Sequence, residues 1–374
     1  MLTVPTEVGV APRAYLTPSL FIQGRKCLAR LAWASSDAAR LVPQDPSAIL
    51  GTALHRVQEQ ADRGELSGQG EAYKDAARTA FDRAAADALA QAHPLVRMRY
   101  PRLTDLPRFY LQRAQSAEMA FEHARSGAGR RGGDSQTAVE QSLASRDGLL
   151  RGRADCLDVV NQRITDYKSG SGPAAGGDTV SKDEELQLLF YAALARDNGV
   201  PVREGCIVRA DGRRASCSLP ADAAAEIADE ARTLLASFSA GIAAGLSPDA
   251  LAAPSPSACT FCSFRALCPS FWREAAPAWS AEVGSHAQML VEDVREAGTP
   301  RAPSVVVRGQ VTGGSVTPSA ATAHFPLGLI TTPDGPAATA GSQLRLLHVR
   351  EETETGTRLL PDRERGFVWL LPPF

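Results

Sequence analysis

The stretch GRADCLDVVNQRITDYKSG, residues 152–170, contains two apolar runs that carry carboxylates. On a strand, side chains two residues apart share a face. We therefore expect Asp166 and Lys168 to lie together on one face of the second run, with Tyr167 pointing to the other. By the same alternation, Cys156 should face away from its neighbour Asp155.

Three acids, Glu140, Asp155 and Asp166, fall on consecutive strand-like segments. Two carboxylates 4 Å apart repel each other by about 4 kcal/mol at an effective dielectric constant of ~20, and a bound cation removes that cost. Oxygen ligands suit Mg²⁺ or Mn²⁺. Such a centre can activate water and neutralise a phosphoryl oxygen, with Lys168 orienting the water. An acid two residues before a lysine also fits an ordinary solvated strand face.

Length and composition limit the classes of protein. A chain of 374 residues favours two domains, and the net charge of −2 excludes a basic field over the whole molecule but not a local basic groove. No apolar run is long enough to span a bilayer, and the N-terminus lacks a secretory pattern, so we expect a cytoplasmic protein without a membrane partner. The residues that could line a groove for phosphates are Arg25, Lys26, Arg30, Arg102, Arg108, Arg113, Arg130, Arg131, Arg153, Arg213 and Arg214.

Apolar periodicity and turn residues predict an α/β core. The expected helices are 46–65, a broken segment 71–123, 186–199 and 221–245, and Cys27 is expected within a further helix capped by Ser19. The expected strands are 137–144, 148–160 and 163–170, followed by a hairpin that turns at Asp211–Gly212. Loops are expected at 125–136 and 171–184.

After about residue 275, Gly, Thr, Val and Pro replace the helix formers, and short strand-like runs follow one another closely. This pattern is typical of a small β-barrel or sandwich. We predict two domains, residues 1–275 and an all-β domain 276–374, for which an OB-like nucleic-acid-binding barrel is one interpretation. The aromatic residues of this tail, Phe325, Phe367, Trp369 and Phe374, are expected mainly in its core.

Four motifs occur in order along the first domain: Gly51 and His55 in GTALH, Gly152 to Asp155, Asp166 to Lys168, and Gln187 to Tyr191. Together they resemble the PD-(D/E)xK nuclease superfamily, and in particular its RecB-like exonuclease branch. The resemblance implies a restriction-endonuclease-like core, a central mixed sheet flanked by helices. Taken singly, His55 also fits a core histidine, and Gln187 and Tyr191 also fit an ordinary half-buried helix.

The resemblance also implies roles for individual residues. The ligands of Mg²⁺ or Mn²⁺ would be His55, Asp155, Asp166 and the carbonyl of Tyr167, with Glu140 as a less strict family acid. Lys168 would be the catalytic lysine, acting with the two aspartates. Gln187 and Tyr191, one helical turn apart, would contact the nucleic acid or hold Lys168.

Cys259, Cys262 and Cys268 form a C-x2-C-x5-C segment, and Cys27 precedes Cys259 by 232 residues. The local spacing fits zinc as well as iron–sulfur chemistry. With a remote fourth cysteine, the set resembles the iron–sulfur nucleases of the RecB-like branch, the AddB type and the CRISPR-associated exonucleases. That resemblance implies a 4Fe–4S cluster that joins the two ends of the nuclease domain as a structural staple. Cys156, Cys206 and Cys217 are interpreted as small strand residues.

The function that these features favour is a metal-dependent deoxyribonuclease, an exonuclease or end-processing enzyme acting on single-stranded or frayed DNA. The sequence has no G-x-x-x-x-G-K-[ST] motif, so duplex resection would need a helicase partner. Double-strand-break repair, CRISPR spacer processing and phage defence are suitable settings. One alternative is a catalytically silent DNA-binding or assembly subunit, and another is a structural protein stapled by zinc.

Overall fold

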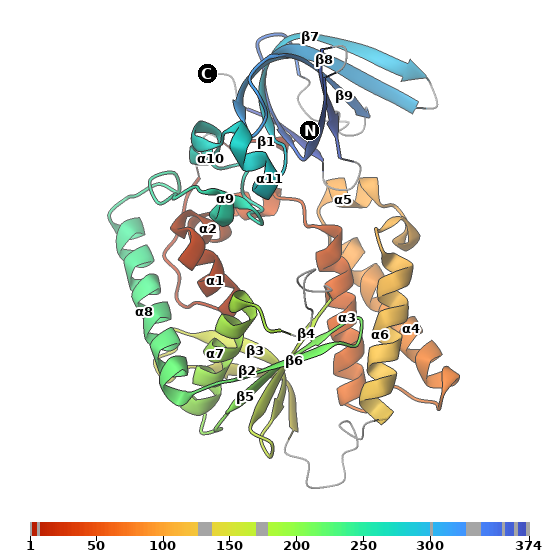
Figure 1. Ribbon diagram of the computed structural model, residues 1–374, viewed down its shortest axis with the longest axis vertical. Coiled ribbons are helices and arrows are strands. Elements are labelled where there is room, and N and C mark those ends of the chain that lie inside the picture. The colour runs from red at the N-terminus through yellow and green to blue at the C-terminus, as the bar shows by residue number, and fades with distance from the viewer. Residues whose placement is uncertain are drawn as a thin grey trace. The chain divides into compact units, whose positions relative to one another are not determined.

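The structure is a computed structural model that describes residues 2–5, 8–125, 137–169, 179–299, 302–326, 338–353, 356–362 and 366–371 (Figure 1). For residues 2, 137–140, 302 and 303, only the backbone is described. The chain forms two compact units, one made of 1–12, 23–42 and 240–374 and the other of 13–22 and 43–239. The domain boundary predicted after residue 275 stays a prediction.

The helices largely follow the apolar stripes and end where the sequence supplies breakers. Helix α3 starts at Pro46 because the Asp45 carboxylate accepts the Ser47 N–H, and the left-handed Gly64 lies just beyond its end. The predicted break-up of 71–123 is confirmed. The α-helices are α1 Pro18–Lys26, α2 Leu28–Ala34, α3 Pro46–Asp62, α4 Glu71–Ala90, α5 Pro94–Arg99, α6 Phe109–Arg125, α7 Lys182–Asp197, α8 Ala221–Ala243, α9 Pro256–Cys259, α10 Pro269–Glu274 and α11 Ser280–Val283.

Two of the predicted elements are wrong in detail. Cys27 does not lie inside a helix, because its extended backbone, with φ −168°, separates α1 from α2. Residues 182–184 belong to α7 rather than to a loop, since Ser181 and Glu184 form a reciprocal capping box at the start of that helix.

A five-stranded mixed sheet forms the centre of the second unit and confirms the α/β prediction. Its order is β2-β3-β4-β5-β6, and every neighbouring pair is antiparallel except β4 with β5. The hairpin predicted at Asp211–Gly212 is present, with Gly212 in the left-handed region. The bounds are β2 Thr137–Ala144, β3 Arg151–Asp158, β4 Arg163–Lys168, β5 Glu204–Arg209 and β6 Arg214–Ser218.

Helices pack on both faces of this sheet. Cys156, Tyr167 and Cys206 join one apolar cluster with α3, α4 and α6. Gly205, which precedes Cys206 and so faces the other way, lies against Leu188 of α7. The motif-bearing strands β3 and β4 are therefore held inside a three-layer α/β/α arrangement.

The other unit contains an eight-stranded sheet in the order β1-β13-β10-β7-β8-β9-β12-β11. Only His348 separates β10 from β11, so the pairing of β10 with β7 and of β11 with β12 closes the sheet on itself. The buried Phe325 and Trp369 confirm a core position for these two aromatic residues. The strands are β1 Leu2–Thr3, β7 Ala287–Thr299, β8 Ala302–Gly314, β9 Ala320–Pro326, β10 Gln343–Leu347, β11 Val349–Glu352, β12 Thr357–Pro361 and β13 Phe367–Leu370.

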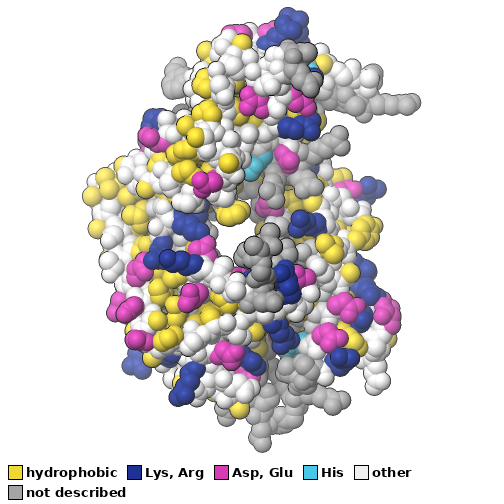
Figure 2. Space-filling view, in the orientation of Figure 1, with side chains coloured by type: hydrophobic (Ala, Val, Ile, Leu, Met, Phe, Trp, Pro, Cys, Tyr) yellow, Lys and Arg dark blue, Asp and Glu magenta, His cyan; other side chains and the backbone are white. Residues whose placement is uncertain are grey.

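Side chains of both signs are intermixed on the face drawn in Figure 2, as the net charge of −2 leads one to expect. Among the described residues, no helix has both the length and the apolar character that crossing a membrane requires.

Candidate active site

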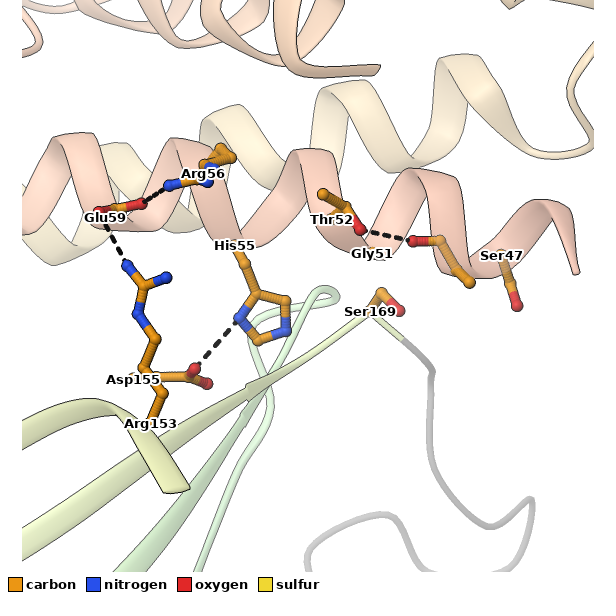
Figure 3. Close-up of a pocket in the computed structure, with 10 residues that line it drawn as sticks. Ser47, Gly51, Thr52, His55, Arg56, Glu59, Arg153, Asp155 and Ser169 are labelled. Atoms are coloured by element: carbon orange, nitrogen blue, oxygen red, sulfur yellow. Dashed lines mark hydrogen bonds and ion pairs between the residues drawn. The ribbon is translucent and has the colours of Figure 1, made fainter. Parts of the chain in front are cut away.

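A cavity of about 540 Å³ opens between α3, strand β3 and the end of β4 (Figure 3). His55 and Asp155 lie in its middle. Gly51, Thr52 and Ser169 lie towards one end, and Glu59, Arg56 and Arg153 towards the other. Gly51 allows this end of α3 to approach β4, since a Cβ there would lie 3.2 Å from the Ser169 hydroxyl.

The two motifs from α3 and β3 meet directly. His55 Nδ1 lies 3.3 Å from Asp155 Oδ1. The other carboxylate oxygen of Asp155 accepts the Tyr167 N–H at 2.8 Å. Because the described β3–β4 pairing stops at Cys156 and Thr165, the Asp155 side chain takes over as the partner of this N–H in β4. Asp155 thus links the histidine helix to the strand that carries Asp166 and Lys168.

Asp166, Lys168 and Gln187 form a closed triangle. Lys168 Nζ lies 2.8 Å from Asp166 Oδ2, which confirms that the two side chains share one side of β4. Lys168 also donates to Gln187 Oε1 at 2.8 Å, and Gln187 Nε2 donates to Asp166 Oδ1 at 2.7 Å. Burial raises the pKa of Asp166 to about 6, while the Lys168 ammonium opposes this shift.

The start of α7 is fixed by a buried ion pair that the sequence reading did not identify. Arg209 of β5, which is 1% exposed, donates to both carboxylate oxygens of Glu184 at 2.8 and 3.1 Å. Glu184 is also the capping-box acid of α7, and Arg209 is the β5 partner of Lys168 in the sheet. A bidentate pair of this kind holds the Gln187 helix in register with the lysine strand.

Tyr191 lies on α7 one turn after Gln187, but its contacts are with β3. Its hydroxyl donates to the Arg153 carbonyl at 2.9 Å, and its ring packs on Gly152, where a Cβ would approach Tyr191 Cε1 to 2.7 Å. Gly152 of one motif therefore leaves the space that the Tyr191 ring of another motif occupies. The roles of Gln187 and Tyr191 in substrate binding stay predictions.

Gly152→Ala is expected to destabilise the protein by about 1–3 kcal/mol, because the new methyl group would overlap the buried Tyr191 ring. Thermal unfolding measures this effect, at roughly 2–4 °C per kcal/mol for a unit of this size. In a Tyr191→Ala background the same change should cost much less. An equal loss of unfolding free energy in the two backgrounds would contradict the contact between Gly152 and Tyr191.

Tyr167 points away from Lys168, as predicted, and enters the apolar cluster with Cys156. Its hydroxyl lies 3.5 Å from the buried Asp62, which in turn lies 2.5 Å from His123 Nε2. Burial raises the pKa of Tyr167 well above its ordinary value, and the Asp62 carboxylate raises it further. The phenol is therefore neutral and anchors β4 from behind the site.

The remaining predicted acid, Glu140, lies on β2, and its side chain is outside the described part of the structure. Its neighbours Val139 and Gln141 pair with Cys156 and Ala154, so its backbone position is opposite Asp155. Arg130, Arg131 and most of the two predicted loops also lie outside the described residues. Three other members of the predicted basic set form ion pairs with nearby carboxylates: Arg102 with Asp105, Arg113 with Asp82, and Arg213 with Asp211.

In the other unit, Cys27, Cys259, Cys262 and Cys268 line one small cavity of about 20 Å³. Backbone contacts hold the remote cysteine there: the Ala253 N–H donates to Cys27 Sγ at 3.4 Å, and the Ala29 N–H donates to the Leu251 carbonyl at 3.2 Å. The extended backbone at Cys27 thus places its thiol beside the C-terminal cysteine segment.

Two buried arginines, Arg30 and Arg265, line the same cavity. Burial raises the pKa of the Cys259 and Cys262 thiols and raises that of Cys268 to about 12, so without a cation these thiols are neutral. Among the described residues, no three His, Cys, Asp or Glu side chains stand close enough together to form a metal-binding group. This holds for the carboxylate site as well as for the cysteines.

A second group that sequence reasoning missed surrounds Glu59. Its carboxylate contacts Arg56 at 2.7 Å, Arg63 at 2.6 Å and Arg153 at 3.4 Å. The position of Glu59, four residues after His55 on the same helix, was an available signal that the two share a face. Arg209 had no comparable local signal, since the parallel pairing of β4 with β5 brings it to the site.

Comparison with known proteins agrees with this geometry. The family model described as the PD-(D/E)XK nuclease superfamily matches residues 16–269. The chain therefore belongs to the PD-(D/E)XK nuclease superfamily, a class of enzymes that hydrolyse phosphodiester bonds. No curated protein matches the sequence.

Proposed function

We propose that the protein is a metal-dependent deoxyribonuclease of the RecB-like branch, which trims single-stranded or frayed DNA ends. The observation that carries this proposal is the triangle of Asp166, Lys168 and Gln187 beside the His55–Asp155 pair. His55 and Asp155 line the cavity, and the Asp155 carboxylate accepts the N–H of Tyr167, the residue between Asp166 and Lys168.

The residues that would hold Mg²⁺ or Mn²⁺ are His55, Asp155, Asp166 and the Tyr167 carbonyl, with Glu140 as a further ligand. Their oxygen-rich donor set suits these cations. The donor set supports the fit: the buried Asp166 carboxylate is paired with the Lys168 ammonium and accepts a hydrogen bond from the Gln187 amide, so a cation beside it would add to a favourable charge balance. A divalent cation, when bound, neutralises phosphate charge and lowers the pKa of water.

Lys168 would supply a positioned positive charge for the reaction. Its ammonium has three donors, of which Asp166 and Gln187 use two, so one can reach a water or a phosphate oxygen. Gln187 limits the conformers of Lys168, and Tyr167 fixes the backbone between the aspartate and the lysine. The chemistry is in-line attack of water on phosphorus, with the lysine stabilising the charge that develops on oxygen.

We further propose that the four cysteines hold a 4Fe–4S cluster. Four thiols lining one cavity match the ligand set of such clusters, and the two buried arginines beside them favour thiolates. Arg30 Nε is buried there without a hydrogen-bond partner among the described residues, which fits a negatively charged neighbour. Zinc is the alternative occupant.

The closed sheet of the other unit is proposed to be an OB-like barrel that contacts the DNA strand. If β10 and β11 are taken as one bent strand, the closed ring has five strand positions, because β7, β8, β9 and β12 complete it and β13 and β1 lie beyond β10. Five strands suit an OB-like barrel. Because Phe325 and Trp369 are buried, strand contacts would depend on charged residues rather than on base stacking by these two. A helicase partner would supply single strands in repair or phage defence.

The proposal is tested with anaerobically purified protein, Mn²⁺ and DNA labelled at one end, in single-stranded and duplex forms. We expect metal-dependent products from single strands, whose lengths reveal the polarity of digestion. DNA binding without cleavage in Mg²⁺ or Mn²⁺ would instead identify a silent DNA-binding subunit.

A further inference from the structure

The end of the active-site cavity beside Glu59 is a cluster of one carboxylate and three guanidinium groups. Glu59 is 5% exposed and contacts Arg56, Arg63 and Arg153 at 2.7, 2.6 and 3.4 Å. Arg63 also lies 3.9 Å from the Glu65 carboxylate. Arg56 and Arg153 line the cavity and are about half exposed, so two guanidinium groups are accessible from it.

Helix pairing explains only part of this cluster. Arg56 and Arg63 lie three residues before and four residues after Glu59, which is the ordinary spacing of ion pairs on a helix. Arg153 comes from β3, 94 residues away in the sequence. Arg153 is thus the one guanidinium of this cluster that extends from the strand to the helix, and it lines the cavity.

The Glu59–Arg153 pair repeats the geometry of the His55–Asp155 pair. Four residues along α3 advance about 6 Å, and two residues back along β3 cover about 6.6 Å. The two contacts therefore lie side by side between the same helix and strand, separated by about one helical turn (Figure 3). The first contact joins the proposed metal ligands His55 and Asp155, and the second joins Arg153 to the buried Glu59.

We propose that Arg153, held by Glu59 and assisted by Arg56, binds the phosphate next to the one that is cleaved. This inference rests on the proposed nuclease function and adds a subsite to it. A guanidinium carries five donors in a planar fork, and the Arg153 side chain is about half exposed, so it can contact Glu59 and a phosphate at the same time. Glu59 is a positioning residue in this arrangement, because it orients the arginines without touching the DNA.

The test is binding of a fluorescent single-stranded 12-mer, measured by anisotropy at several salt concentrations with Ca²⁺ in place of Mg²⁺ or Mn²⁺. Arg153→Gln is expected to weaken binding roughly 10-fold and to reduce the slope of log K against log[salt] by about 0.7, the share of one single-strand phosphate contact. Arg153→Lys should keep the slope, since it keeps the charge. A single methylphosphonate next to the cleaved linkage should weaken wild-type binding but add little to Arg153→Gln.

Arg63→Gln is the matched control, because Arg63 contacts Glu59 but is not among the residues that line the cavity. Its salt slope should equal that of the wild type. If Arg153→Gln behaves like Arg63→Gln while the wild type binds and cleaves DNA, the phosphate subsite is wrong and the nuclease function stands. If the wild type neither binds nor cleaves the strand, the proposed function itself fails.

Discussion

Lys168→Ala is expected to reduce DNA cleavage by about 10²- to 10⁴-fold in protein that remains folded and binds DNA. The ammonium group lies within 2.8 Å of both Asp166 Oδ2 and Gln187 Oε1, and alanine removes the only cation of this triangle. Charge that develops on oxygen during hydrolysis would then lose its donor. The measurement is the single-turnover rate on end-labelled single-stranded DNA in Mn²⁺, which separates chemistry from product release.

Lys182→Ala is the matched control, because Lys182 is an exposed lysine in the first turn of the same α7 that carries Gln187. It should cleave at the wild-type rate. Circular dichroism and thermal unfolding check that both variants are folded. An unchanged rate in Lys168→Ala would mean that the cleavage centre lies elsewhere in the chain.

Strand periodicity sufficed to predict how Asp166, Tyr167 and Lys168 are arranged. A period of two residues places the aspartate and the lysine together and sends the tyrosine to the other side, and the structure has all three in these positions. This rule is local and needs no knowledge of the fold. The same is true of the Asp211–Gly212 turn, where glycine adopts a left-handed conformation.

Contacts between distant elements could not be derived in this way. Arg209 reaches Glu184 because β4 and β5 pair in parallel across a crossover, and no short-range pattern contains that pairing. Cys27 was predicted inside a helix because its flanking residues favour one. Tertiary contacts with residues 251–253 override that preference and hold its backbone extended.

Gly152 is an intermediate case. The sequence marks it as the first residue of a G-x-x-D motif without giving a reason for glycine. The structure supplies the reason, because the ring of Tyr191 occupies the space where a Cβ would project. Two motifs that look independent in the sequence thus share one packing contact, and the Tyr191 hydroxyl also holds the carbonyl of the next residue on β3, Arg153.

Cys268→Ser is expected to abolish the proposed 4Fe–4S cluster and to lower the melting temperature by about 10–20 °C. Cys27 and Cys259 are 232 residues apart, and closing a loop of that length restricts the unfolded chain by about 5 kcal/mol in the chain-entropy model. Serine retains the size of the side chain but is a poor ligand for iron. The loss should therefore reflect the missing cross-link rather than a cavity in the core.

The matched control is Cys217→Ser, since Cys217 lies on β6 and is not among the residues that line the cysteine cavity. Anaerobically purified wild type and Cys217→Ser should be brown, with broad absorption near 400 nm and four irons per chain, and Cys268→Ser should be colourless. A colourless wild type with one zinc per chain would replace iron–sulfur by zinc as the staple. Identical metal content and melting temperature in the two variants would contradict any metal at these cysteines. The two ends of the loop would then be held by contacts of the folded state such as the Ala29 N–H to the Leu251 carbonyl and the Ala253 N–H to Cys27 Sγ, and hydrogen bonds of this kind contribute only about 1 kcal/mol each.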